Sequence, residues 1–316
     1  MMAHRDVNAS PDAFLKAIAP YRDGIVVTVE CLFTWSWLAD LCAQEGMPVV
    51  LGHALDRKAI HGGEAKNDRI DAHKIAVLLR GGLLPQASVY PANMRATRDL
   101  LRRRMSLMRQ RAELLTHLQH TNRPYNRPEI GQKIADKANR DGVAERFPDP
   151  AGQKSIAVAL ALIGRYDQLL RHMEVSTLNT AKQYHTNTLY LLRRGPGIGE
   201  ILSSVLLYEI PDSVRFRRGQ EFVSYCRLVT CARESAGKRY GTVGTKIGNA
   251  YCKGACFAAA VLFLRDNPAG QKYLTRLEKQ HGQGHALTVL AHQLARAVYC
   301  MLKRHTACEM DKFLNG

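Results

Sequence analysis

The sequence has no apolar run long enough to cross a membrane, and it has too little acidic charge to balance its basic charge. Its 316 residues contain 45 Lys and Arg against 28 Asp and Glu, a net charge of +17. A transmembrane helix needs roughly 20 apolar residues, and the N-terminus lacks the charged-then-apolar order of a signal peptide. We therefore expect a cytoplasmic protein with a polyanionic partner, nucleic acid first among them, and no membrane role.

The eight cysteines include no C-x-x-C pair, so the usual spacing of zinc ligands is missing. Most of these cysteines lie in apolar helical patterns, and we interpret them as reduced thiols of the core. A hydrophobic content of 46% over this length is enough for two domains with real cores.

Two carboxylates stand three residues apart at the start of a predicted helix. Asp68 and Asp71 share one face at the positive end of the helix dipole. Mg²⁺ prefers oxygen ligands and often takes one or two carboxylates together with phosphate oxygens, which suits phosphodiester chemistry. The alternative is a solvated helix face on which these aspartates pair with Arg69 and Lys74.

The N-terminal part alternates between helical and strand patterns. The expected order is helix 11–20, strand 24–30, helix 35–46, strand 48–51 and then the helix with Asp68. This βαβ order predicts a parallel sheet with ligands at the carboxyl ends of its strands. Glu30 ends the first strand, so we expect it to converge with Asp68 and Asp71.

A basic helix follows, with seven arginines and one acid between residues 95 and 111. Apolar residues at heptad spacing predict that it pairs with a second amphipathic helix near 156–173. The arginines indicate either phosphate contact or a solvated face, and the net charge favours phosphate contact. The candidate nucleic-acid contacts here are Arg95, Arg98, Arg102, Arg103, Arg104 and Arg109.

Two motifs stand out nearer the C-terminus. Arg193 and Arg194 precede a turn containing Gly197 and Gly199, which resembles the hairpin of helix-hairpin-helix DNA-binding motifs. Further on, a polar loop at 233–241 is predicted to hold Ser235 among three cations, which are Arg233, Lys238 and Arg239. Such a serine could attack phosphorus; the alternative is an ordinary phosphate-binding or capping serine.

These motifs together resemble a known family. Glu30, Lys66–His73, Gly195–Gly199, Glu234–Gly237 and Lys246–Asn249 occur in the order and spacing of DEDD-class insertion-sequence transposases. These are bridge-RNA-guided recombinases related to Piv-type DNA invertases. The resemblance implies a RuvC-like domain with an RNase H fold, in which Glu30, Asp68 and Asp71 match three of four Mg²⁺-binding acids. It also implies Ser235 as the nucleophile.

The same resemblance implies the partners: DNA, a guide RNA, and further copies of the chain in a dimer or tetramer. The protein would be bacterial and nucleoid-associated when bound to DNA. We expect three parts: an incomplete RuvC-like domain at 1–85, a basic helical coiled-coil region at 86–190, and a mostly helical transposase domain at 191–316. The fold class is thus α/β plus mostly α.

One departure is that the family's first strands and first aspartate have no counterpart before Glu30. We interpret the chain as an N-terminally truncated or decayed copy, which predicts that it is poorly soluble or inactive. The favoured function is a DNA transposase or recombinase. The alternatives are a Holliday-junction-type nuclease, in which water is the nucleophile, and a non-catalytic nucleic-acid-binding remnant.

Overall fold

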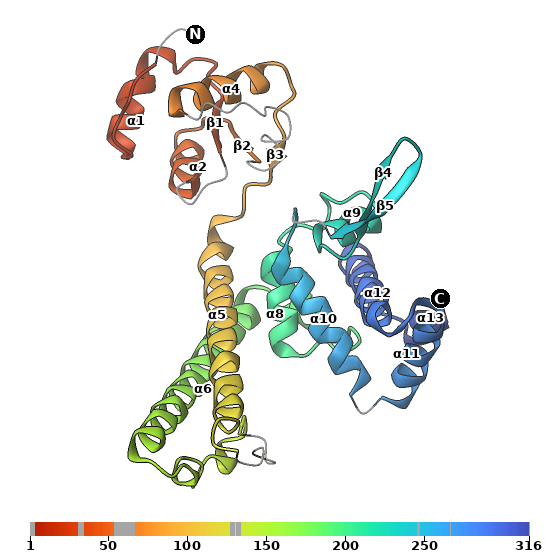
Figure 1. The fold of residues 1–316 in the computed structure, drawn as a ribbon. Coiled ribbons are helices and arrows are strands. Elements are labelled where there is room, and N and C mark those ends of the chain that lie inside the picture. The colour runs from red at the N-terminus through yellow and green to blue at the C-terminus, as the bar shows by residue number, and fades with distance from the viewer. Residues whose placement is uncertain are drawn as a thin grey trace. The chain divides into compact units, whose positions relative to one another are not determined.

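The structure is a computed structural model that describes residues 4–30, 35–53, 67–126, 130, 134–244, 247–265 and 267–315 (Figure 1). The chain forms two compact units, Met1–Arg95 and Ala96–Gly316. Over the described residues it is mostly helical, with a small mixed sheet and a β-hairpin. An α/β part followed by a mostly α part is therefore confirmed. None of the described helices combines the length and the apolar character that a bilayer span requires.

The N-terminal unit is a small sheet packed against helices. Strands β1 and β2 are parallel, as predicted, and β2 pairs antiparallel with the two-residue β3, which is too short to leave a sequence pattern. The sheet order is β1-β2-β3. The elements are α1 (Pro11–Ile18), a 3₁₀ turn η1 (Ala19–Tyr21), β1 (Val27–Glu30), α2 (Trp35–Gln44), β2 (Val49–Gly52), α4 (Asp68–Arg80) and β3 (Gln86–Ala87).

Side-chain caps fix where the helices of this unit begin. Ser10 accepts a hydrogen bond from the Ala13 N–H at the start of α1, and Asn67 accepts one of 2.9 Å from the Arg69 N–H at the start of α4. Between residues 4 and 26 the described chain forms α1 and η1 and no strand. Strand β1 consequently lies at the edge of the described sheet.

The C-terminal unit contains the long helices and the hairpin. Helix α5 begins four residues before the unit boundary and continues through it. The elements are α5 (Ala92–Thr121), 3₁₀ turns η2 (Lys137–Asn139) and η3 (Ala144–Arg146), α6 (Pro150–Tyr184), α7 (Thr186–Arg193), α8 (Glu200–Glu209), α9 (Gly219–Tyr225), β4 (Thr230–Ser235), β5 (Lys238–Gly244), α10 (Ala250–Leu264), α11 (Pro268–His281), α12 (Gln283–Arg304) and α13 (Met310–Asn315). Most of the region expected at 86–190 thus lies in the same unit as 191–316.

The predicted pairing of the two long helices is confirmed. Helices α5 and α6 lie side by side (Figure 1), with Leu118 packed against Ile156 and Ile163 in a shared core. Arginines of α5 also form ion pairs with acids of α6: Arg104 with Glu174, and Arg111 with Asp167. Part of the basic charge of α5 is therefore used to hold this helical hairpin together.

Asp167 should make the stability of the helical hairpin depend on pH. Burial tends to raise the pKa of Asp167, but hydrogen bonds of 2.6 Å from Arg140 and Arg111 outweigh it and lower the pKa. A depressed folded-state pKa adds stability above the unfolded value of about 3.9, and this stability is lost as pH falls through the folded value. Asp167→Asn should therefore lower the melting temperature near neutral pH and have little effect in strong acid. Glu113→Gln, an exposed site on α5, is the control; equal losses for Asp167→Asn at both pH values would contradict this.

The prediction of a polar loop at 233–241 is wrong, because this segment belongs to a β-hairpin. Strands β4 and β5 are antiparallel, with Ser235 opposite Lys238. Ala236 and Gly237 form the two-residue turn, and both have positive φ, +49° and +72°. Turns with two positive φ angles match the twist of a hairpin. A ribbon outside the core needs no apolar alternation, so the sequence carries no strand pattern here.

Cys42, Cys226, Cys252 and Cys256 are buried free thiols, which confirms the interpretation of these four as core residues. Burial raises the pKa of Cys252, so it stays protonated.

Candidate functional site

The two aspartates begin a stripe of α4 whose later residues face the core. Asp68 is exposed and Asp71 half-buried, and Ile75 and Leu78 continue the same stripe into the core. Helix α4 packs against β1, whose last residue is Glu30. The structure therefore brings together the two elements that carry the predicted acids.

These acids do not form a closed set of metal ligands. Among the residues that the structure describes, no three His, Cys, Asp or Glu side chains group closely enough to hold a metal ion. The donor types are nevertheless those that Mg²⁺ prefers, and Asp68 and Asp71 lie at the positive end of the α4 dipole. Because three ligands do not group together among the described residues, we assign no chemical step to a metal at this position.

Ser235 is the last residue of β4, directly before the turn at the tip of the hairpin. Figure 1 shows the hairpin projecting from the helices around α9. Lys238 and Tyr240 on β5 are exposed. The side chains of Arg233, Ser235 and Arg239 lie outside the described part of the structure, so the register alone locates these residues. That register places the ammonium-bearing Lys238 opposite the serine.

The base of the hairpin leads to a buried carboxylate that the sequence did not single out. Glu209 ends α8, and its side chain is 2% exposed. It accepts hydrogen bonds from Arg98 Nε at 2.9 Å, from Arg102 Nε at 2.7 Å and from Arg102 Nη2 at 2.9 Å. Asn249 Nδ2 donates a fourth, at 2.8 Å. We call Glu209, Arg98, Arg102 and Asn249 the Glu209 cluster.

The charges of the Glu209 cluster shift the pKa of Arg102. Burial tends to lower the pKa of Arg102, but the hydrogen bond and the charge of Glu209 raise it above its ordinary value. The Arg102 guanidinium also lies 4.4 Å from the centre of the Tyr251 ring, a favourable cation–π distance. Arg102 is therefore a charged group, 32% exposed, whose guanidinium is engaged by contacts within the chain.

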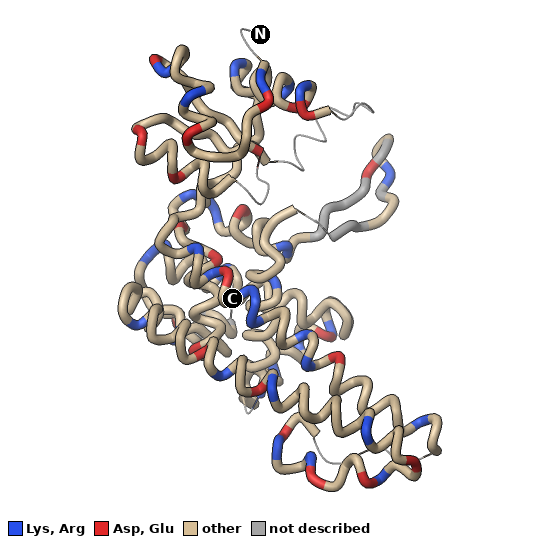
Figure 2. Tube along the Cα trace, turned by 90° about the vertical axis from the view of Figure 1, so that its left-hand side faces the viewer, with Lys and Arg blue, Asp and Glu red and all other residues tan. Residues whose placement is uncertain are grey.

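Several arginines predicted to contact nucleic acid are thus committed within the chain. Besides Arg98 and Arg102, Arg95 pairs with Asp40 at 2.7 Å and Arg104 with Glu174 at 2.6 Å. Figure 2 shows basic and acidic residues interspersed along the helices. Of the six α5 arginines predicted to contact nucleic acid, Arg103 and Arg109 are exposed, and neither is paired with a carboxylate among the described residues. These two remain the α5 arginines open to a phosphate.

The glycine turn between α7 and α8 packs mainly against the protein itself. Gly197 has φ +68°, and a Cβ there would lie 2.0 Å from the Ala259 carbonyl oxygen of α10. Gly199 caps α8, and a Cβ there would meet open space. The two glycines therefore have different roles: Gly197 lets the turn approach α10, and Gly199 leaves the start of α8 accessible.

The arginines before this turn also differ. Arg193 pairs with Glu200 at 3.1 Å and lies near the Tyr190 ring. Arg194 is exposed. A helix N-terminus with an exposed arginine is suited to a phosphate, so Arg194 and Gly199 fit the helix-hairpin-helix interpretation better than Arg193 and Gly197 do.

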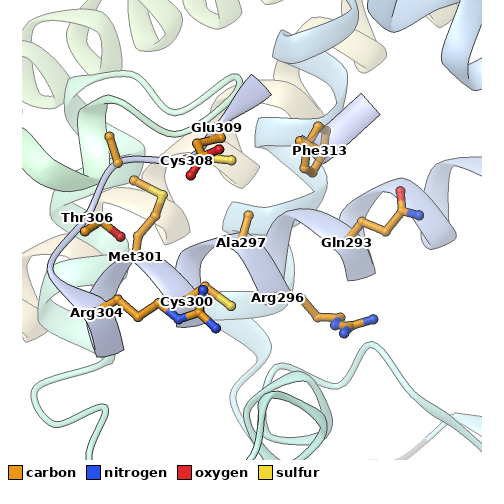
Figure 3. A pocket seen from close by; sticks show the side chains of 11 residues that line it. Gln293, Arg296, Ala297, Cys300, Met301, Arg304, Thr306, Cys308, Glu309 and Phe313 are labelled. Carbon is orange, nitrogen blue, oxygen red and sulfur yellow. The ribbon is translucent and has the colours of Figure 1, made fainter. Parts of the chain in front are cut away.

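A cavity of about 420 Å³ lies between α12 and the segment that follows it (Figure 3). Cys300, Cys308, Arg296 and Arg304 are among its lining residues. Burial raises the pKa of Cys308. The cavity is built on elements other than α4 and the hairpin, and we assign it no part in the chemistry.

Glu209 and Asn249 are the residues that sequence reasoning missed as parts of the site. Glu209 directly follows the mostly apolar run 201–208. An acid buried at the end of such a run requires a hydrogen-bonded or charged partner. Asn249 stood out only as the last residue of the Lys246–Asn249 motif that carries the family resemblance. Nothing local indicates that the two side chains meet across 40 residues.

Comparison with known families divides the chain into two matched segments. A family model described as Transposase, of the DEDD type found in IS110 elements, matches residues 9–122. A second model, described as Transposase IS116/IS110/IS902 family, matches residues 189–275. No curated protein matches the chain. The first segment contains Glu30, Asp68 and Asp71, and the second contains Ser235 and the glycine turn.

Proposed function

We propose that this chain, which carries two transposase domains of the IS110 family, is a DNA transposase that cuts and rejoins strands through Ser235. The observation that supports Ser235 as the nucleophile is the hairpin register. Ser235 lies beside the turn of a projecting ribbon and opposite the exposed Lys238. A nucleophile at a projecting tip can reach a phosphodiester bond that a recessed one could not.

The proposed step is a transesterification. The serine oxygen forms a bond to phosphorus as the bond from phosphorus to one sugar oxygen breaks. One phosphoester bond breaks and one forms, so their number is conserved, and the serine proton is taken up overall by the departing sugar oxygen. Lys238 would stabilise the extra negative charge of the pentavalent transition state. Rejoining is the reverse attack by a sugar hydroxyl on the phosphoserine.

The acids of the N-terminal unit form the second part of the proposal. Asp68 and Asp71, with Glu30 at the end of the neighbouring strand, are the residues that would hold a divalent cation. The support is the packing of α4 on β1 and the position of the aspartates at the start of α4.

The proposed partners are DNA and a guide RNA, with assembly into a dimer or tetramer. The net charge of +17 supports a polyanionic partner. The exposed cations Arg103, Arg109, Arg194 and Lys238 are the phosphate contacts we propose. RNA guidance and oligomerisation rest on the family resemblance.

The serine is tested by trapping. A nicked substrate should accumulate a protein–DNA adduct with the wild-type chain, and Ser235→Ala should form none, because the phosphoserine bond cannot exist without the hydroxyl. Ser224→Ala, an exposed serine on α9, is the matched control and should form the adduct normally. Strand cleavage by Ser235→Ala at the wild-type rate would instead support the nuclease alternative, in which water is the nucleophile.

A further inference from the structure

The hairpin is clamped at its base by bonds between the residues that enter it and those that leave it. On the entering side, Arg227 Nε donates to the Gly248 carbonyl at 2.9 Å. On the leaving side, the Asn249 N–H donates to the Tyr225 carbonyl at 2.6 Å. Two chain segments more than twenty residues apart are thus joined where the ribbon emerges.

Gly248 is what allows this close approach. It has φ +111°, and a Cβ there would lie 2.5 Å from the Tyr225 carbonyl oxygen. Any other residue would be strained in φ and would push the two segments apart. The clamp therefore depends on backbone contact as well as on side chains.

Asn249 joins the clamp to the helical core. Its Oδ1 accepts from the Tyr251 and Cys252 N–H groups at 2.9 and 3.0 Å and so caps α10. Its Nδ2 donates to Glu209 Oε2 at 2.8 Å and to the Tyr225 hydroxyl at 3.0 Å. Both donors and both acceptor sites of the amide are in use, and the residue is 6% exposed.

Glu209 is a buried, multiply hydrogen-bonded anchor for this amide. Its carboxylate is held by Arg98 and Arg102 of α5 and is 2% exposed. Charge-assisted hydrogen bonds of this kind are short and directional. The hairpin base is therefore fixed through one side chain to helices α8, α5 and α10.

We infer that Asn249 is a positioning residue for the Ser235 hairpin, holding the ribbon at the angle from which the serine reaches its phosphate. This inference rests on the proposed serine chemistry. An isolated two-stranded ribbon is only marginally stable, and Tyr240 near its tip is 69% exposed. The base must therefore set the direction of the ribbon.

The hairpin is long enough that a small change of angle at its base displaces Ser235 near its tip. Strand β5 has 7 residues, which at about 3.4 Å per residue gives roughly 20 Å. A tilt of roughly 3° at the base would move the tip by about 1 Å. A misplacement of that size can cost on the order of 100-fold in rate.

The test is Asn249→Ser. Serine is also a good helix cap, so α10 keeps its cap while both Nδ2 hydrogen bonds are lost. At saturating nicked DNA we expect the rate of adduct formation to fall at least about tenfold, with DNA affinity changed less than about threefold. Amide hydrogen exchange in 230–244 should become faster. Asn267→Ser is the control, because Asn267 caps α11 in the same way, accepting from the Gly270 N–H, and it should change neither readout.

The outcomes separate the inference from the proposed function. If Ser235→Ala abolishes the adduct but Asn249→Ser forms it at the wild-type rate with unchanged hairpin exchange, Asn249 does not position the serine. If Ser235→Ala forms the adduct normally, the proposed serine chemistry is refuted. The anchoring is then judged by hydrogen exchange alone, and unchanged exchange in 230–244 of Asn249→Ser would refute it.

If Asn249→Ser does not fold, Tyr225→Phe is the second variant, because it removes the hydroxyl that accepts from Nδ2 and keeps the ring. It should lower the rate of adduct formation less than Asn249→Ser would, and an unchanged rate would overturn the inference.

Discussion

Replacing Glu209 by alanine is expected to lower the free energy of unfolding by about 3–5 kcal/mol, the usual cost of removing one partner from a buried ion pair. The Glu209 side chain is 2% exposed and faces two guanidinium groups. Without the carboxylate, Arg98 and Arg102, whose side chains are 21% and 32% exposed, would lose their partner. The buried Asn249 amide would lose an acceptor as well. Thermal unfolding followed by far-UV circular dichroism measures the loss.

Glu174→Ala is the matched control for this prediction. It removes an acid that also pairs with an α5 arginine, but the Glu174 side chain is 30% exposed and pairs with Arg104 alone. Glu209 is 2% exposed and accepts four hydrogen bonds, so Glu174→Ala should lower the unfolding temperature less than Glu209→Ala does. Equal losses for Glu174→Ala and Glu209→Ala would show that the four bonds of the Glu209 cluster add nothing beyond a single ion pair.

The Glu209 cluster also shows why charge patterns along a helix are ambiguous. The arginine density of α5 predicted phosphate contact, yet Arg98 and Arg102 point to a carboxylate more than 100 residues away in sequence. A buried acid requires such cations, and only the fold brings them together. The distinction between a basic surface and an internal ion cluster therefore depends on tertiary contacts that periodicity does not contain.

Local elements were more predictable because their causes are local. The helix that begins at Asp68, the strand that ends at Glu30 and the basic helix with heptad spacing were each predicted from residues close together in sequence, and all three elements are found. The hairpin at 230–244 was missed because its turn depends on positive φ at Ala236, which the residue type does not announce. The spacing of Asp68 and Asp71 predicted their shared helix face, whereas a third ligand depends on the packing of a different element.

Gly197→Ala is expected to be the second strongly destabilising change, at roughly 2–6 kcal/mol, from the strain of a left-handed backbone together with overpacking. The new Cβ would lie 2.0 Å from the Ala259 carbonyl oxygen and 2.7 Å from the Phe263 nitrogen. Both are backbone atoms of a buried helix and cannot rotate away. Denaturant unfolding of the full chain measures the loss.

Gly199→Ala separates packing from nucleic-acid binding in the same turn. Its φ is −83° and a Cβ there meets nothing within 4 Å, so the fold should lose only about 0.5–1 kcal/mol, because alanine caps a helix less well than glycine does. If the N-terminus of α8 receives a phosphate, the added methyl group should weaken DNA binding while lowering the melting temperature far less than Gly197→Ala does. The pair thus assigns a separate role to each glycine: a stable Gly197→Ala variant would refute the packing against α10, and unchanged DNA affinity in Gly199→Ala would refute a phosphate at the start of α8.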